Sequence, residues 1–207
     1  MSDWETDEAN NTDLEKVPSV VTYNSKGEVN SWGFTPKERQ HHISWFKMGL
    51  CEEARKMLAK ERPERHNKLY DLLATYNKDP LDVSADYLRL LWAHSMENIR
   101  EKVDPLLWEN IKMRIVLTVP AIWDHKAQAL TRQAAKMAGM LDRKGSTLEL
   151  IGEPEAAALA VFKGMNTSRN HSSLKVSHTE LISITHTNVF NRLETRLLSV
   201  MLEEARL

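Results

Sequence analysis

Cysteine and glycine are scarce in this chain, and each shortage excludes something. Cys51 is the only cysteine among 207 residues, so no disulfide can form within the chain, which fits a reducing compartment. No two of the seven glycines are adjacent or separated by a single residue. Loops that cradle phosphates need closely spaced glycines, because backbone N–H groups must approach the phosphates with no Cβ in the way. The sequence therefore contains no glycine-rich phosphate loop, and the G-x-x-x-x-G-K pattern is absent too.

Excess charge and long apolar runs are also missing. The net charge is −1, which gives no field that attracts nucleic acid or an acidic membrane. No run approaches the ~20 apolar residues that span a bilayer. Residues 1–16 hold six acids and one base, unlike a secretory signal, and we interpret them as a disordered acidic tail. We expect a cytoplasmic protein with no nucleic-acid and no membrane partner.

The first half of the chain carries a hairpin pattern followed by helical patterns. In residues 17–34, β-branched and aromatic residues flank the turn formers of residues 24–27, which predicts two short strands. Residues 42–77 hold two apolar stripes at helical spacing, separated at Pro63. A helix is predicted over residues 84–103, with Asp82 or Ser84 as its cap.

Two units of strand, sharp stop and helix follow. The first strand, within residues 113–119, ends at Pro120, and a helix over residues 124–140 begins at Asp124, a good N-cap. The second strand, residues 148–151, ends at Gly152-Glu153-Pro154 and leads into a helix over residues 154–163. The fold class is therefore α/β, with a small mixed sheet formed by residues 17–34, 113–119 and 148–151 and flanked by helices.

The motifs TVPAIW, at residues 118–123, and GEPEAAALA, at residues 152–160, resemble the ATPase domain of the heat-shock protein 70 family. The run PSV at residues 18–20 and WGF at residues 32–34 match its divergent branch of fungi and animals. The resemblance covers residues 17–165 and implies a partial first lobe of an actin-like ATPase, a ribonuclease H-like fold. Residues 166–207 lie beyond it as a divergent C-terminal tail.

The resemblance implies roles for two residues. Glu153 matches the family's catalytic glutamate, which orients a magnesium-bound water, and Pro120 matches its switch proline. From the residues alone, Glu153 is also a helix cap and Pro120 a strand terminator, so both interpretations stay open. The cofactors implied by the resemblance are ATP and Mg, with ATP and ADP as ligands. The histidines, including His41 and His42, form no metal motif, so no metal site is predicted from the residues.

The resemblance also calls for two glycine-rich phosphate hairpins, which have no counterpart in these 207 residues. Two hypotheses follow. The first is a heat-shock-70-like chaperone ATPase that couples ATP binding and hydrolysis to conformational change. The second is a truncated, non-catalytic relative that acts as a binding module or is a fragment without function. The missing hairpins predict weak or absent ATP binding by this chain. We also expect an exposed sheet edge, which a protein partner could cover.

Overall fold

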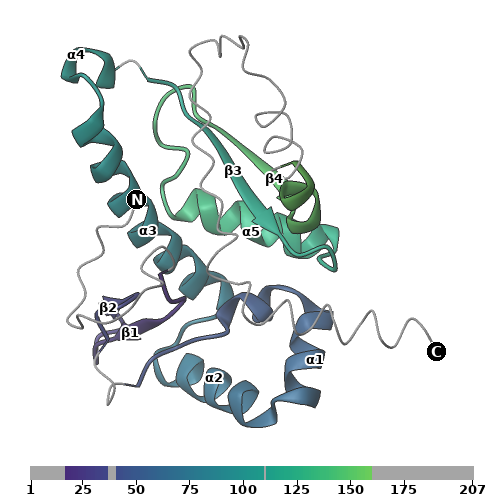
Figure 1. The fold of residues 1–207 in the computed structure, drawn as a ribbon. Coiled ribbons are helices and arrows are strands. Elements are labelled where there is room, and N and C mark those ends of the chain that lie inside the picture. The colour runs from purple at the N-terminus through teal and green to yellow at the C-terminus, as the bar shows by residue number, and fades with distance from the viewer. Residues whose placement is uncertain (1–16, 37–40, 110, 160–207) are drawn as a thin grey trace, which may run out of the picture.

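The computed structural model describes residues 17–36, 41–109 and 111–159, and Figure 1 shows their arrangement. The sequence predictions for residues 1–16, 160–163 and 166–207 lie outside these residues. The elements in chain order are β1 (Val21–Tyr23), β2 (Val29–Trp32), η1 (Phe46–Leu50), α1 (Glu52–Glu61), α2 (Pro63–Thr75), α3 (Pro80–Lys102), α4 (Pro105–Trp108), β3 (Arg114–Val119), α5 (His125–Met137) and β4 (Thr147–Gly152). After β4 the chain turns into a further helix at Glu153.

The predicted hairpin at residues 17–34 is confirmed as the antiparallel pair β1 and β2. Its turn is held by the Asn24 side chain, whose Oδ1 accepts hydrogen bonds from the backbone N–H groups of Lys26 and Glu28 at 2.9 and 3.0 Å. Gly27 adopts φ +75°, which glycine tolerates without a steric penalty. An Asx-type turn with glycine at the left-handed position is therefore what the sequence pattern specified.

The charged segment of residues 42–77 forms two helices, as its stripes predicted. Pro63 starts α2, which agrees with the preference of proline for the first helical turn. Ala54 and Leu58 of α1 and Leu69 and Leu73 of α2 are buried, and the opposite faces of these helices are exposed. The helices are thus held by packing of their apolar faces.

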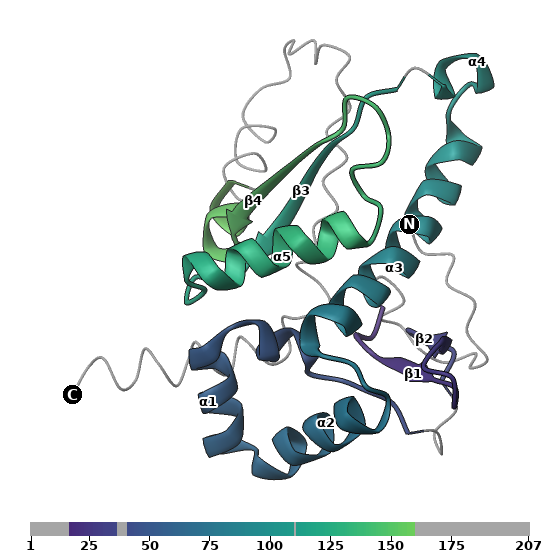
Figure 2. The ribbon, with the colours of Figure 1, turned by 180° about the vertical axis from the view of Figure 1, so that it is seen from behind.

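Helix α3 begins earlier than predicted. Its N-cap is Asp79, which forms a capping box with Asp82, and Pro80 occupies the first turn. The prediction of Asp82 or Ser84 as the cap was wrong because both lie inside the helix. The Ser84 hydroxyl instead donates to the Pro80 carbonyl oxygen at 2.6 Å. Figure 2, the view from behind, shows α3 running from the β1–β2 end of the molecule to the β3–β4 end.

The β3–α5–β4 unit follows the predicted pattern closely. The strands pair in parallel from Arg114↔Thr147 to Val119↔Gly152, and α5 covers one face of them. Asp124 caps α5 by accepting a hydrogen bond from the Ala127 N–H at 2.8 Å. The α5 helix ends beside Gly139, which adopts φ +77° and donates its N–H to the Lys136 carbonyl. The described part of the predicted helix at residues 154–163 is also helical.

The prediction of one mixed sheet was wrong. The described residues form two separate two-stranded sheets, β1–β2 and β3–β4. Each packs against a different face of α3. Residues Val83, Tyr87 and Leu91 of α3 join the hairpin core, whereas Leu88, Trp92 and Met96 join the β3–β4 core. The long helix therefore separates strands that the sequence pattern alone had grouped.

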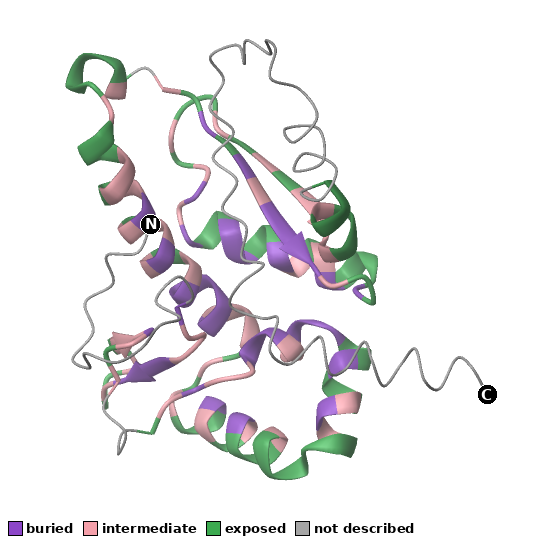
Figure 3. Cartoon of the chain, viewed as in Figure 1, coloured by how far each residue is buried: buried purple, intermediate pink, exposed green. Residues whose placement is uncertain are grey.

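A third apolar cluster joins the two ends of the molecule. Leu50, Cys51 and Ala54 of the η1–α1 region pack with Val119, Trp123 and Ala127 of the β3–α5 region. Figure 3 shows buried residues on η1 and on the end of β3, which lie on either side of this junction. The junction brings the carboxyl edge of β3 and β4 next to η1.

Candidate functional site

The carboxyl edge of the β3–β4 pair brings together both residues implied by the family resemblance. Parallel strands end at the same edge, and Val119 and Gly152 are the last register partners. Pro120 follows Val119 and Glu153 follows Gly152, so the two residues leave the sheet as neighbours. Ligands of open α/β sheets bind at this kind of edge. The structure thus brings Pro120 and Glu153 to one edge of the sheet, a juxtaposition that the sequence analysis did not state.

Glu153 forms an ion pair that the sequence analysis missed. Its Oε1 lies 3.1 Å from the Nζ of Lys47, which is 106 positions earlier in the chain. The side chains are only 12% and 11% exposed, so this is a largely buried pair. Glu153 is also the first residue of the helix that follows β4, where the helix dipole favours a negative charge.

Lys47 is held in place by its surroundings. It belongs to the one-turn helix η1, between the buried residues Phe46 and Leu50. Its Nζ lies 5.3 Å from the centroid of the Trp123 ring, which gives a cation–π contact in addition to the ion pair. A lysine within the apolar run of residues 43–50 was the one signal in the sequence, because a buried lysine requires a partner.

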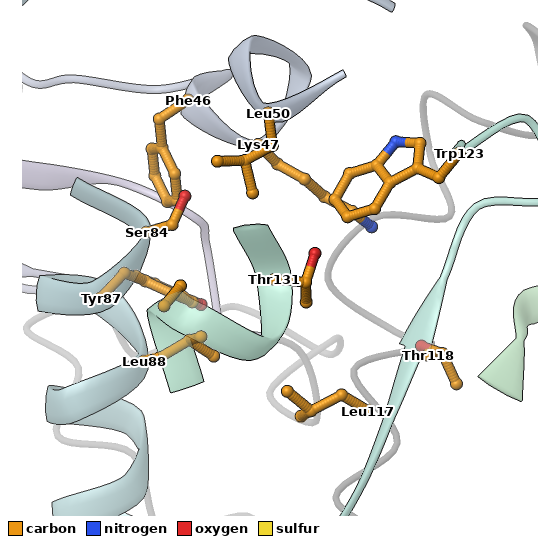
Figure 4. Close-up of a pocket in the computed structure, with 11 residues that line it drawn as sticks. Phe46, Lys47, Leu50, Ser84, Tyr87, Leu88, Leu117, Thr118, Trp123 and Thr131 are labelled. Atoms are coloured by element: carbon orange, nitrogen blue, oxygen red, sulfur yellow. The ribbon is translucent and has the colours of Figure 1, made fainter. Parts of the chain in front are cut away.

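A small cavity of about 50 Å³ lies beside this pair, and Figure 4 shows its lining. Lys47 and Trp123 form one wall, and Leu117 and Thr118 of β3 form another. The Thr118 hydroxyl is buried and has no hydrogen-bond partner in the part of the chain that the structure describes. A space of this size holds a few water molecules, so it suits solvation of that hydroxyl rather than binding of an organic ligand.

The turn after β3 is fixed by hydrogen bonds around Pro120. The Trp123 N–H donates to the Pro120 carbonyl oxygen at 3.1 Å, and the Gln128 Nε2 donates to the Trp123 carbonyl oxygen at 3.2 Å. These bonds place the Trp123 ring over Lys47. Pro120 therefore terminates its strand and begins a hydrogen-bonded turn.

The described residues do not by themselves fit magnesium or a triphosphate. No group of three or more histidine, cysteine, aspartate or glutamate side chains within them could hold a metal ion. Lys47 and Glu153 contact each other, and the chain lacks the closely spaced glycines of a phosphate cradle. No catalytic step through ATP or magnesium is therefore derived from this geometry. In the same residues, no helix is long and apolar enough to cross a membrane.

The site thus belongs to a mixed α/β protein with a buried lysine–carboxylate pair at the carboxyl edge of parallel strands. Comparisons with known proteins extend this description. The chain is 32% identical over 155 residues to human heat shock 70 kDa protein 12B, covering 70% of this chain and 22% of that protein. It is 36% identical over 155 residues to a chaperone protein HscA homolog of Vibrio parahaemolyticus, covering 70% and 23%. Human heat shock 70 kDa protein 12A is 27% identical over 157 residues, covering 70% and 22%.

The chain therefore contains a divergent, partial domain like that of the heat-shock protein 70 family, which confirms the resemblance seen in its motifs. It spans less than a quarter of the length of these relatives. No family model matches the chain, and no solved structure matches it significantly.

Proposed function

We propose that residues 17–165 form part of the first lobe of an actin-like ATPase fold in which Glu153 and Pro120 keep the family positions. We further propose that this polypeptide by itself binds Mg-ATP weakly or not at all. The observation that carries the proposal is the Lys47–Glu153 pair at the carboxyl edge of β3 and β4. It supplies the charged groups of a phosphate site, but each charge is already neutralised by the other.

Two features support weak nucleotide binding. A phosphate at Lys47 must either displace Glu153 or lie beside its carboxylate, and each alternative costs part of the binding free energy. The missing glycine-rich hairpins remove the backbone amides that hold phosphates in the family. Because the loss of one preorganised donor typically costs ~10²-fold or more in such sites, the loss of two hairpins predicts little turnover.

The second candidate function is a non-catalytic binding module. The burial of the same ion pair and the contact of Lys47 with Trp123 favour it, because these contacts join η1 to β4 as a structural connection. In the described residues β3 and β4 pair only with each other, so each strand has an unpaired edge. A protein partner that covers such an edge stays a prediction.

Calorimetric titration of the full chain with Mg-ATP tests the proposal. We expect no saturable binding below about 1 mM and no phosphate release above background. Lys47→Met should leave both baselines unchanged, and Glu153→Ala should leave phosphate release at background. Micromolar binding with turnover that Glu153→Ala abolishes would contradict weak binding and establish an ATPase.

A further inference from the structure

A polar groove lies between α2 and the segment of residues 42–45, and it shares no lining residue with the cavity beside the Lys47–Glu153 pair. Its volume is about 330 Å³. One face of α2 supplies Leu69 and Leu72 as an apolar floor and Arg65 and Lys68 as a cationic rim, because these positions are three, four and seven residues apart. Ser44 and Trp45 line the opposite wall, together with His42.

Arg65 and Lys68, the two cations of the groove, have no carboxylate partner among the described residues, unlike several other cations of this protein. Lys47, Lys78, Arg89 and Arg114 each contact a carboxylate. Within the described residues, no ion pair involves Arg65 or Lys68, and no carboxylate lines the groove. Two positive charges therefore line the groove, and no described carboxylate neutralises them.

The guanidinium of Arg65 is positioned by a contact with Trp45. Its Cζ lies 4.7 Å from the centroid of the Trp45 ring, so the guanidinium makes a cation–π contact with the indole. A contact with a ring face uses none of the guanidinium N–H groups as a conventional hydrogen-bond donor, and these groups match two oxygens of a phosphate or carboxylate. The contact thus reduces the entropy that Arg65 would lose on binding an anion.

Trp45 itself adopts an unusual backbone conformation that positions this wall. Its φ is +66°, in the left-handed region that bulky residues rarely occupy. Such a conformation is strained and persists where its surroundings hold it. Here it precedes η1 and sets the indole against Arg65. This strain is an independent observation that concentrates at the same groove.

We propose that this groove binds a small organic phosphate monoester. A phosphate monoester carries a charge of about −1.5 to −2 at pH 7 and three acceptor oxygens, which match Arg65, Lys68 and the Ser44 hydroxyl. The apolar floor of Leu69 and Leu72 receives the organic group. The volume suits a small molecule, because it lies near the lower limit of known ligand pockets. The proposal does not depend on nucleotide binding at Glu153.

Phenyl phosphate is the probe, followed by NMR chemical-shift titration of the full chain. We expect saturable shifts confined to residues 42–45 and α2, with an affinity of about 1 mM, as its size allows. Inorganic phosphate and phenol, which each carry half of the ligand, should bind several times more weakly. The double variant Arg65→Gln/Lys68→Gln should weaken phenyl phosphate binding about tenfold or more.

The matched control is Arg55→Gln/Lys60→Gln, which removes the same charges from exposed positions of α1. It should bind phenyl phosphate as the parent chain does, and both double variants should keep the parent melting temperature. Equal weakening in the two variants, or no saturable shift in the parent, would overturn the site. Loss of binding in Lys47→Met would assign the phosphate to the other site. A phosphotyrosine peptide that binds tenfold more tightly than phenyl phosphate would replace the small-molecule ligand with a phosphopeptide.

Discussion

The Lys47–Glu153 pair gives the sharpest prediction about the energetics of this protein. We consider Lys47→Met, which keeps the apolar stem of the side chain, and Glu153→Gln, which keeps its shape. Each variant leaves one charge in a site where the side chains are only 11% and 12% exposed. Breaking a fully buried pair costs about 3–5 kcal/mol. Because some water reaches this pair, we expect each variant to lower the free energy of unfolding by about 2 kcal/mol.

The double variant decides whether the charges interact. When both charges are removed, no unpaired charge remains, and the apolar methionine can pack below Trp123. We therefore expect the double variant to lose about 2 kcal/mol, no more than either single variant, which gives a coupling free energy of about 2 kcal/mol. The measurement is urea unfolding at pH 7, followed by far-ultraviolet circular dichroism, for all four proteins of the cycle.

The exposed pair Arg114–Glu149 on the same two strands is a matched control. Its side chains are about half exposed, at 48% and 51%, although its N–O distance of 2.6 Å is shorter. The Gln variants of these residues should show a much smaller coupling, because water solvates either charge alone. If the losses at Lys47 and Glu153 simply add in the double variant, the pair contributes no specific connection and the reasoning above is refuted.

Three further predictions concern the frame around the site. Asp86 is buried and accepts hydrogen bonds from Tyr23, Lys78 and Arg89 at 2.9, 3.1 and 2.6 Å, so Asp86→Asn should cost about 3 kcal/mol whereas the exposed Asp71→Asn costs little. Burial raises the pKa of Asp86, but these three donors outweigh it and hold the pKa below its ordinary value of 3.8. The stabilisation by Asp86 is therefore present above pH 3.8 and lost as the pH falls further towards the folded-state pKa. The urea midpoint of the parent chain should fall over this pH range, and the contribution of Asp86 to that fall should be absent from Asp86→Asn. Asp79→Ala removes the capping box of α3 and should lower the free energy of unfolding, measured by thermal unfolding, by about 1 kcal/mol. Asn also caps helices, so Asp79→Asn is the control, and an equal loss in both variants would contradict the role of the cap. Gly139→Ala, at φ +77° with a Cβ 2.9 Å from the Asp142 Oδ2, should destabilise by about 1–2 kcal/mol, whereas Gly152→Ala, with 3.9 Å to the Pro154 Cδ, should melt near the parent temperature.

The elements of the β3–α5–β4 unit were predictable because local chemistry specifies them. Pro120 ends a β-branched run, Asp124 caps the following helix, and Gly139 supplies the left-handed residue at its end. The hairpin at residues 17–34 was predictable for the same reason, since its turn is held by bonds between near neighbours in the chain. These predictions rest on contacts within a few residues, which a sequence displays directly.

The arrangement of these elements was not predictable, because it depends on distant contacts. The partner of Glu153 lies 106 residues away, and periodicity says nothing about such a pair. The error of one mixed sheet has the same origin, because α3 carries different apolar faces for the two sheets along one uninterrupted pattern. The late start predicted for α3 came from following apolar spacing, whereas the capping box of Asp79 and Asp82 sets the start, with Pro80 in the first turn.

The coupling between Lys47 and Glu153 also bounds what Lys47 can contribute to anion binding. When a phosphate displaces the Glu153 carboxylate from the Lys47 ammonium, the coupling free energy is subtracted from its affinity. A coupling of about 2 kcal/mol lowers the affinity about thirtyfold relative to an unpaired lysine. Glu153→Gln should therefore strengthen any anion binding at Lys47 while it destabilises the fold. If Glu153 were catalytic, its replacement would abolish turnover with little effect on stability. Measuring anion binding, turnover and stability of Glu153→Gln therefore distinguishes the structural role of Glu153 from a catalytic one.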